Sequence, residues 1–191
     1  MAFFSAKNAG TAFMIVAVLS IIGAAFVIYT GNEVGNIAAY AVLAVGSVIC
    51  AILYFIFGNK VRTGVISDKV EILATYVRIV GLVTIIGAVF TAIWEFMLIG
   101  SLAASLITVA VGIIFGLIIL FMSMKINDGK QTTGDKLIWI ILLIAFVILL
   151  LVSLAEIISI VGIIDGICHL IIYSFMILLL IDEDVKKAMG I

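Results

Sequence analysis

The sequence contains no proline, few charged residues and only two cysteines. Charged side chains make up 11% of the 191 residues, whereas 66% are apolar and the mean hydropathy is +1.51. A soluble domain is about half apolar and about a quarter charged, so this chain cannot cover its own surface with polar groups in water. The composition excludes a soluble enzyme and predicts an integral membrane protein.

The few residues able to bind metals or act as nucleophiles are poorly placed for either role. Cys50 and Cys168 lie in apolar runs where no disulfide framework could form. A zinc site would need three or four ligands from a chain with one histidine and two cysteines. No serine stands in a Gly-x-Ser-x-Gly setting, and the charges near the C-terminus are too few and too mixed for a nucleic-acid-binding arm. We expect no enzyme activity, no metal, no cofactor and no nucleic-acid partner.

Six apolar runs are long enough to cross a bilayer as helices, because a hydrocarbon core of ~30 Å requires about 20 residues. They cover residues 11–29, 37–57, 72–94, 101–124, 137–155 and 159–181. The last two come from one continuous apolar stretch, which we divide by a turn near Glu156. Strands of a membrane barrel would alternate in polarity, so continuous runs favour helices. We predict an all-α polytopic protein with six transmembrane helices in a single domain, 1–191.

The basic residues all fall on one side of the membrane when the six spans alternate in direction. Arg78 lies in the first turns of the third span, from which its side chain can reach that same side. The other nine are Lys7, Lys60, Arg62, Lys69, Lys125, Lys130, Lys136, Lys186 and Lys187. The opposite side carries only acidic residues, namely Glu33, Glu95, Glu156 and Asp165. Basic residues are retained in the cytoplasm during insertion, so we predict a multi-pass cell-membrane protein with both termini cytoplasmic.

An internal repeat groups the spans in pairs. Seven residues of the first span, from Ile15 to Phe26, recur 64 residues later in the third span. The Ala-Val-Gly sequence that ends at Gly46 recurs 66 residues later, ending at Gly112. The unit is a two-helix hairpin, and we predict three in tandem, at approximately 11–57, 72–124 and 137–181, with the third diverged. Such parallel repeats are related by an axis along the membrane normal.

Small residues four positions apart mark the even-numbered spans. The pairs are Gly46 and Cys50, Gly112 and Gly116, and Gly162 and Gly166. Residues at this spacing share one helix face and let two backbones approach closely. We expect these faces to form the centre of the bundle or a surface for self-association, which would make the protein a homo-oligomer or a subunit of a membrane complex, surrounded by lipid. The simpler alternative is that glycine is common in membrane helices.

Further glycines and isoleucines carry a family resemblance. Gly81 and Gly87 lie in the third span, and the fourth contains Val111, Gly112, Ile113 and Ile114. With the tandem hairpins, this pattern resembles the HdeD-like acid-resistance membrane proteins, although this chain lacks proline at the outer turns. The resemblance implies three two-helix hairpins, a role in envelope or acid stress, and no catalytic residues.

Asp165 and His169 are the most conspicuous polar pair in the spans. They lie four residues apart and so share one helix face. An aspartate at the centre of a span costs about 3 kcal/mol, and less toward the interface, so something must offset that cost. The pair could form a hydrogen bond that fixes the register of the bundle. Alternatively, with Glu156 and Glu95, it could form an acidic outward-facing pocket that holds a cation or exchanges a proton, because histidine changes charge in mildly acid surroundings.

Two hypotheses for the function follow. The preferred one is a non-enzymatic membrane component that packs through its glycine-bearing faces, with envelope stress as its setting. The alternative is a small transporter or channel that binds a cation or proton at the acidic outer residues.

Overall fold

The computed structural model describes residues 4–126, 128, 131–158 and 163–191. This part of the chain is almost wholly helical and contains no strand, which confirms the all-α fold class. Its helices are α1 (Ala6–Glu33), α2 (Ile37–Arg62), α3 (Lys69–Ile99), α4 (Leu102–Ile126), α5 (Thr133–Ile158), α6 (Ile163–Leu180) and α7 (Glu183–Ala188).

Local sequence signals set several of the helix ends. The Asp68 side chain accepts a hydrogen bond of 2.8 Å from the backbone N–H of Glu71 and so caps the start of α3. Ser5 caps α1 in the same way through the N–H of Asn8, at 3.4 Å. Gly100 ends α3 in the left-handed region, with a φ of 71°, which glycine adopts without a steric penalty. A short turn can therefore join α3 to α4.

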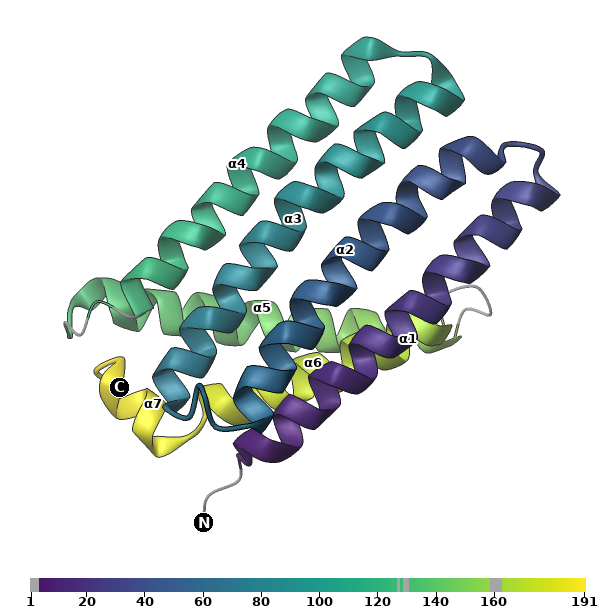
Figure 1. The fold of residues 1–191 in the computed structure, drawn as a ribbon. Coiled ribbons are helices and arrows are strands. Elements are labelled where there is room, and N and C mark those ends of the chain that lie inside the picture. The colour runs from purple at the N-terminus through teal and green to yellow at the C-terminus, as the bar shows by residue number, and fades with distance from the viewer. Residues whose placement is uncertain (1–3, 127, 129–130, 159–162) are drawn as a thin grey trace.

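The helices form two layers (Figure 1). In one layer α1, α2, α3 and α4 lie side by side in chain order, with close pairing of α1 with α2 and of α3 with α4. In the other, α5 and α6 pair with each other and run obliquely behind the first four helices. Helix α6 packs against α1, and the short α7 packs against α3.

Five of the described helices, α1 to α5, are long and apolar enough to cross a membrane. Helix α6 has 18 residues, which correspond to a length of about 27 Å. The chain is thus built as a multi-pass integral membrane protein. The fifth expected span ends at residue 155, whereas α5 continues to Ile158, so Glu156 lies in the last turn of this helix. The apolar run continues past residue 155 and extends the helix by these three residues.

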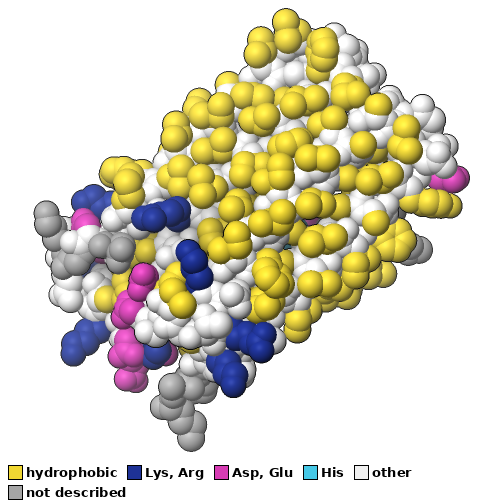
Figure 2. Space-filling view, viewed as in Figure 1, with side chains coloured by type: hydrophobic (Ala, Val, Ile, Leu, Met, Phe, Trp, Pro, Cys, Tyr) yellow, Lys and Arg dark blue, Asp and Glu magenta, His cyan; other side chains and the backbone are white. Residues whose placement is uncertain are grey.

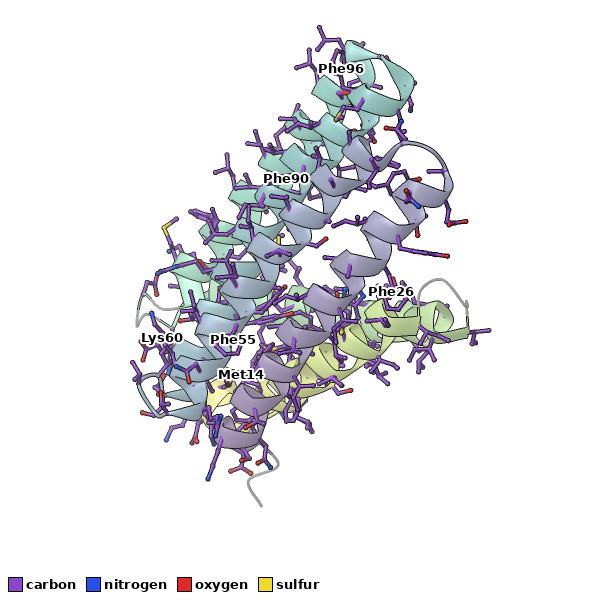
Figure 3. The ribbon with its side chains drawn as sticks, turned by 45° about the vertical axis from the view of Figure 1, so that its right-hand side comes forward. Met14, Phe26, Phe55, Lys60, Phe90 and Phe96 are labelled. Atoms are coloured by element: carbon purple, nitrogen blue, oxygen red, sulfur yellow. The ribbon has the colours of Figure 1, made fainter. Side chains whose placement is uncertain are left out.

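Charge is concentrated at one end of the molecule (Figure 2). Lysine and arginine side chains gather there, near the start of α1 and the end of the chain, while the helix faces beyond them are covered by apolar side chains. Figure 3 shows Lys60 at this end of the first layer and Phe96 at the opposite end. Apolar side chains exposed over most of the helix length require an apolar solvent.

Many of the most buried side chains lie near the charged end, where α1 and α3 meet α6. Phe13 contacts Phe57 with ring centroids 5.0 Å apart and Tyr76 at 5.5 Å, and all three side chains are buried. Met176 and Leu179 of α6 are also buried. This aromatic cluster anchors the α5–α6 pair to the first layer.

Candidate functional site

His169 and Glu156 form a polar contact between α5 and α6. The Nδ1 atom of His169 lies 2.9 Å from the Oε2 atom of Glu156. The side chains are 42% and 35% exposed, so neither is sealed inside the protein. The contact becomes an ion pair when the imidazole carries a proton. The two residues therefore form a polar link between two otherwise strongly apolar helices.

Aromatic rings hold the imidazole in place. The ring of His169 stacks on Tyr173, one helical turn away, with centroids 5.5 Å apart and planes inclined by 23°. Tyr173 stacks on Phe146 of α5 at 6.1 Å, and Phe146 contacts Tyr76 of α3 at 5.9 Å. A continuous series of rings thus connects His169 with the aromatic cluster around Phe13. A movement of the imidazole would therefore change ring contacts between the two layers of helices.

The other two residues of the predicted acidic pocket have different positions. Glu95 lies near the end of α3 and accepts a hydrogen bond of 2.7 Å from the hydroxyl group of Thr108 in α4. That end of α3 lies at the top of Figure 1, whereas α5 ends beside α1 at the right. Asp165 belongs to α6, but its side chain lies outside the described part of the structure. The structure therefore brings Glu156 to His169 and leaves Glu95 in a separate contact.

Neither cysteine takes part in a cluster of ligands. Among the described residues, no group of three or more His, Cys, Asp or Glu side chains could hold a metal ion. Cys168 is buried, and its sulfur lies 4.0 Å from the carbonyl oxygen of Val16, where α6 crosses α1. This position agrees with a small packing residue.

The glycines of α4 face α3 at very short distances. A Cβ atom at Gly112 would collide with the Cβ atom of Ala88. At Gly116 it would collide with the side chain of Ile85 and lie 2.9 Å from the carbonyl oxygen of Gly81. The absence of a side chain at these positions lets the two helices of this pair approach.

The remaining predicted packing glycines also contact this chain's own helices. A Cβ atom at Gly46 would lie 2.7 Å from the ring of Phe90 in α3, and one at Gly166 would lie 2.8 Å from Ile157 in α5. Gly162 lies outside the described residues. The described glycine faces are thus occupied within the chain.

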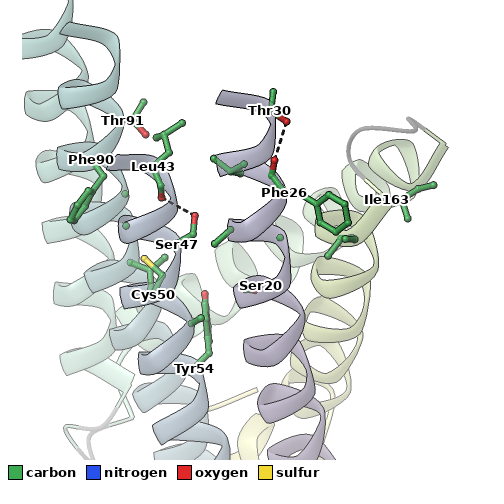
Figure 4. A pocket seen from close by; sticks show the side chains of 18 residues that line it. Ser20, Phe26, Thr30, Leu43, Ser47, Cys50, Tyr54, Phe90, Thr91 and Ile163 are labelled. Carbon is green, nitrogen blue, oxygen red and sulfur yellow. Dashed lines mark hydrogen bonds between the residues drawn. The ribbon is translucent and has the colours of Figure 1, made fainter. Parts of the chain in front are cut away.

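A cavity of about 790 Å³ lies between α1, α2, α3 and the start of α6 (Figure 4). We call it the hydroxyl-lined cavity, because its walls include Ser20, Thr30, Ser47, Tyr54 and Thr91. Sequence reasoning missed it. A signal was present, since Ser47, Cys50 and Tyr54 are spaced three and then four residues apart and so share one face of α2.

An ion-pair network lies outside the spans, at the charged end. The Nζ atom of Lys69 lies 2.8 Å from Asp182 and 2.6 Å from Asp184, and so ties the start of α3 to α7. The hydrogen bond to Asp182, and then that to Asp184, raises the pKa of Lys69. The hydrogen bond from Lys69 lowers the pKa of the Asp184 carboxyl group. This network fixes the C-terminal helix.

Two features of the chain can therefore bear a function: the His169–Glu156 pair and the hydroxyl-lined cavity. The pair places an imidazole beside a carboxylate, and the cavity offers space for a small molecule. Comparisons of the chain with protein-family models, with curated proteins and with solved structures find no match.

Proposed function

We propose that the chain is a small, non-enzymatic membrane transporter or channel that binds a proton, or a small cation in its place, at the His169–Glu156 pair. The observation that carries the proposal is the contact of 2.9 Å between the two side chains on neighbouring apolar helices. Ionisable residues within spans are costly and occur chiefly where they serve transport or proton transfer. A site with one imidazole and one carboxylate matches that use.

Protonation changes the strength of this contact. When His169 carries a proton, its charge and that of the Glu156 carboxylate attract, and the local environment strengthens the attraction because little water screens it. When the imidazole is neutral, only a hydrogen bond remains. Among the described side chains, Glu156 from α5 and Tyr173 from α6 itself face the imidazole. Proton binding would therefore draw α5 and α6 together.

The proposed topology has six spans in three hairpins, with both termini in the cytoplasm of a cell whose plasma membrane holds the protein. The concentration of lysine and arginine at one end supports this orientation, because basic residues are retained on the cytoplasmic side. The length of α6, about 27 Å, is close to the ~30 Å of a hydrocarbon core. On this topology the His169–Glu156 pair lies nearer the outer side.

Self-association, as a homo-oligomer or as a subunit of a membrane complex, is the second proposal. The outer face of α4 is the surface available for it, since Leu106, Ile107, Ile114 and Phe121 are all strongly exposed. The described glycines support it less, since they already pack against helices of the same chain. Either proposal is consistent with a role in envelope or acid stress, as the HdeD-like layout implies.

Proton flux into liposomes tests the transport proposal. His169→Gln and Glu156→Gln remove the proton-binding groups and are expected to abolish acid-driven flux, read from a pH-sensitive dye inside the vesicles. Glu95→Gln is the matched control, because this glutamate also lies near the end of a span but hydrogen bonds to Thr108. Size-exclusion chromatography in detergent checks that each variant is folded. Equal flux through folded His169→Gln protein and the unmodified protein would contradict the proposal.

A further inference from the structure

We infer that the hydroxyl-lined cavity binds a neutral, lipid-soluble alcohol. Its volume, about 790 Å³, falls within the range of about 300–1,000 Å³ that is typical of small-molecule sites. It lies between helices that cross the membrane, so its ligand would come from the bilayer. This site does not depend on proton binding at the His169–Glu156 pair.

Polar side chains from three helices converge on this cavity. Ser47, Cys50 and Tyr54 line it from α2, while Ser20 and Thr91 face it from α1 and α3. Polar groups in a hydrocarbon environment are costly unless they find hydrogen-bonding partners. Their collection around one space indicates a polar group of a ligand among them.

The described wall of the cavity favours a neutral ligand. Among the described side chains that line it, none carries a charge. A carboxylate or an ammonium group placed there would meet no opposite charge from these side chains in surroundings of low polarity. Fatty acids and amines are therefore poor candidates, whereas an uncharged hydroxyl group fits.

The hydrogen bonds already made in the wall indicate what the ligand must supply. The Ser47 hydroxyl group donates to the carbonyl oxygen of Leu43 at 3.1 Å, and that of Thr30 donates to Phe26 at 3.0 Å (Figure 4). A hydroxyl group has one hydrogen to donate and two lone pairs, so both oxygens can still accept a hydrogen bond.

The Tyr54 hydroxyl group points into the same space and supplies a donor (Figure 4). A ligand O–H group can donate to Ser47 or Thr30 and accept from Tyr54, which makes an alcohol the matching chemistry.

Gly87 provides room for the body of the ligand. A Cβ atom built on this glycine would meet no atom within 4 Å, although other glycines of α3 and α4 are closely packed. Gly87 also lines the cavity. A large side chain at this position would project into the space that the alcohol is proposed to fill.

Photolabelling of the full chain in liposomes tests the inference. The probe is dodecanol that carries a diazirine group in its chain, and labelled peptides are identified by mass spectrometry. We expect labelling of the α2 segment around Ser47 and the α3 segment around Gly87, and competition by unlabelled dodecanol. Ser47→Ala removes one acceptor and should weaken the competition about fivefold, the value of one hydrogen bond of ordinary strength. Gly87→Leu should abolish the labelling of this site.

Two controls make the result decisive. Ser105→Ala removes a similar hydroxyl group from α4. This hydroxyl group donates to the Ser101 carbonyl oxygen outside the cavity, so the substitution should leave the labelling and the competition unchanged. A diazirine alkane of equal length without the hydroxyl group should not be concentrated at the cavity. Equal labelling by alkane and alcohol would show that lipid tails fill the space and would overturn the inference. Labelling spread evenly over α4 and α5 would overturn it as well.

Discussion

Alanine at Gly116 should destabilise the protein, whereas alanine at Gly87 should not. Both glycines lie inside long helices, so the intrinsic gain from replacing glycine with alanine, about 1 kcal/mol, is common to both substitutions. Their surroundings differ. A Cβ atom at Gly116 would lie 2.9 Å from the carbonyl oxygen of Gly81 and would collide with the side chain of Ile85. A Cβ atom at Gly87 would meet nothing within 4 Å.

The difference in stability follows from this contact with backbone. Ordinary contacts of a Cβ atom begin near 3.4 Å, so α3 and α4 would have to separate by about 0.5 Å to accept alanine at Gly116. Overpacking of this kind costs about 1–3 kcal/mol. Since the helix-propensity terms cancel, Gly116→Ala should be less stable than Gly87→Ala by about 1–3 kcal/mol.

The difference in the free energy of unfolding can be measured by reversible unfolding in mixed micelles. The mole fraction of sodium dodecyl sulfate is increased, and circular dichroism reports the loss of helix. Gly112 supplies a complementary test, because its missing Cβ atom faces that of Ala88. Gly112→Ala should destabilise the protein, and the added substitution Ala88→Gly should restore part of the loss. Equal stability of Gly116→Ala and Gly87→Ala, or no rescue by Ala88→Gly, would refute the close approach of α3 and α4.

The remaining predictions concern the charged end. Lys69→Met should lower the free energy of unfolding by about 1 kcal/mol, because the partly exposed lysine is the cation that pairs with the buried Asp182 side chain; a smaller change for Asp184→Asn is expected at an exposed carboxylate. Since Lys69 lowers the pKa of Asp184, their pairing should stabilise the protein above about pH 4 and cease to do so as the pH falls through the folded value. An unchanged difference between Asp184→Asn and the unmodified protein on acidification would contradict this. Trp139→Phe removes the 2.8 Å hydrogen bond to the Leu180 carbonyl oxygen and should cost about 1 kcal/mol, and an unchanged unfolding midpoint would argue against it.

The helices could be predicted from the sequence because their causes are local. Long apolar runs without proline favour continuous helices. Asp68 and Gly100 are residue types that commonly cap helices, and they mark the two ends of α3. The oblique packing of α5 and α6 could not be predicted. It depends on which side chains meet across the two layers, and apolar residues cover almost the whole circumference of these helices.

The candidate site was only partly predictable for a related reason. Spacing along one helix pairs His169 with Asp165, whereas the contact across the hairpin to Glu156 depends on how α5 and α6 dock. The hydroxyl-lined cavity depends on how α1, α2 and α3 pack with one another and with the start of α6. The sequence places Ser47, Cys50 and Tyr54 on one helix face but contains no information on whether that face meets a neighbour or a space.

The ¹⁵N signals of the His169 ring test most directly whether the imidazole contacts Glu156. The chain has one histidine, so protein labelled with ¹⁵N-histidine and reconstituted in bilayers gives the signals of a single imidazole ring. The proposed site predicts that Glu156→Gln shifts these signals at a fixed pH, because the substitution replaces the carboxylate that lies 2.9 Å from Nδ1, whereas Glu95→Gln leaves them unchanged. Ring signals that are identical in the unmodified and the Glu156→Gln protein would contradict the contact on which the proposal rests.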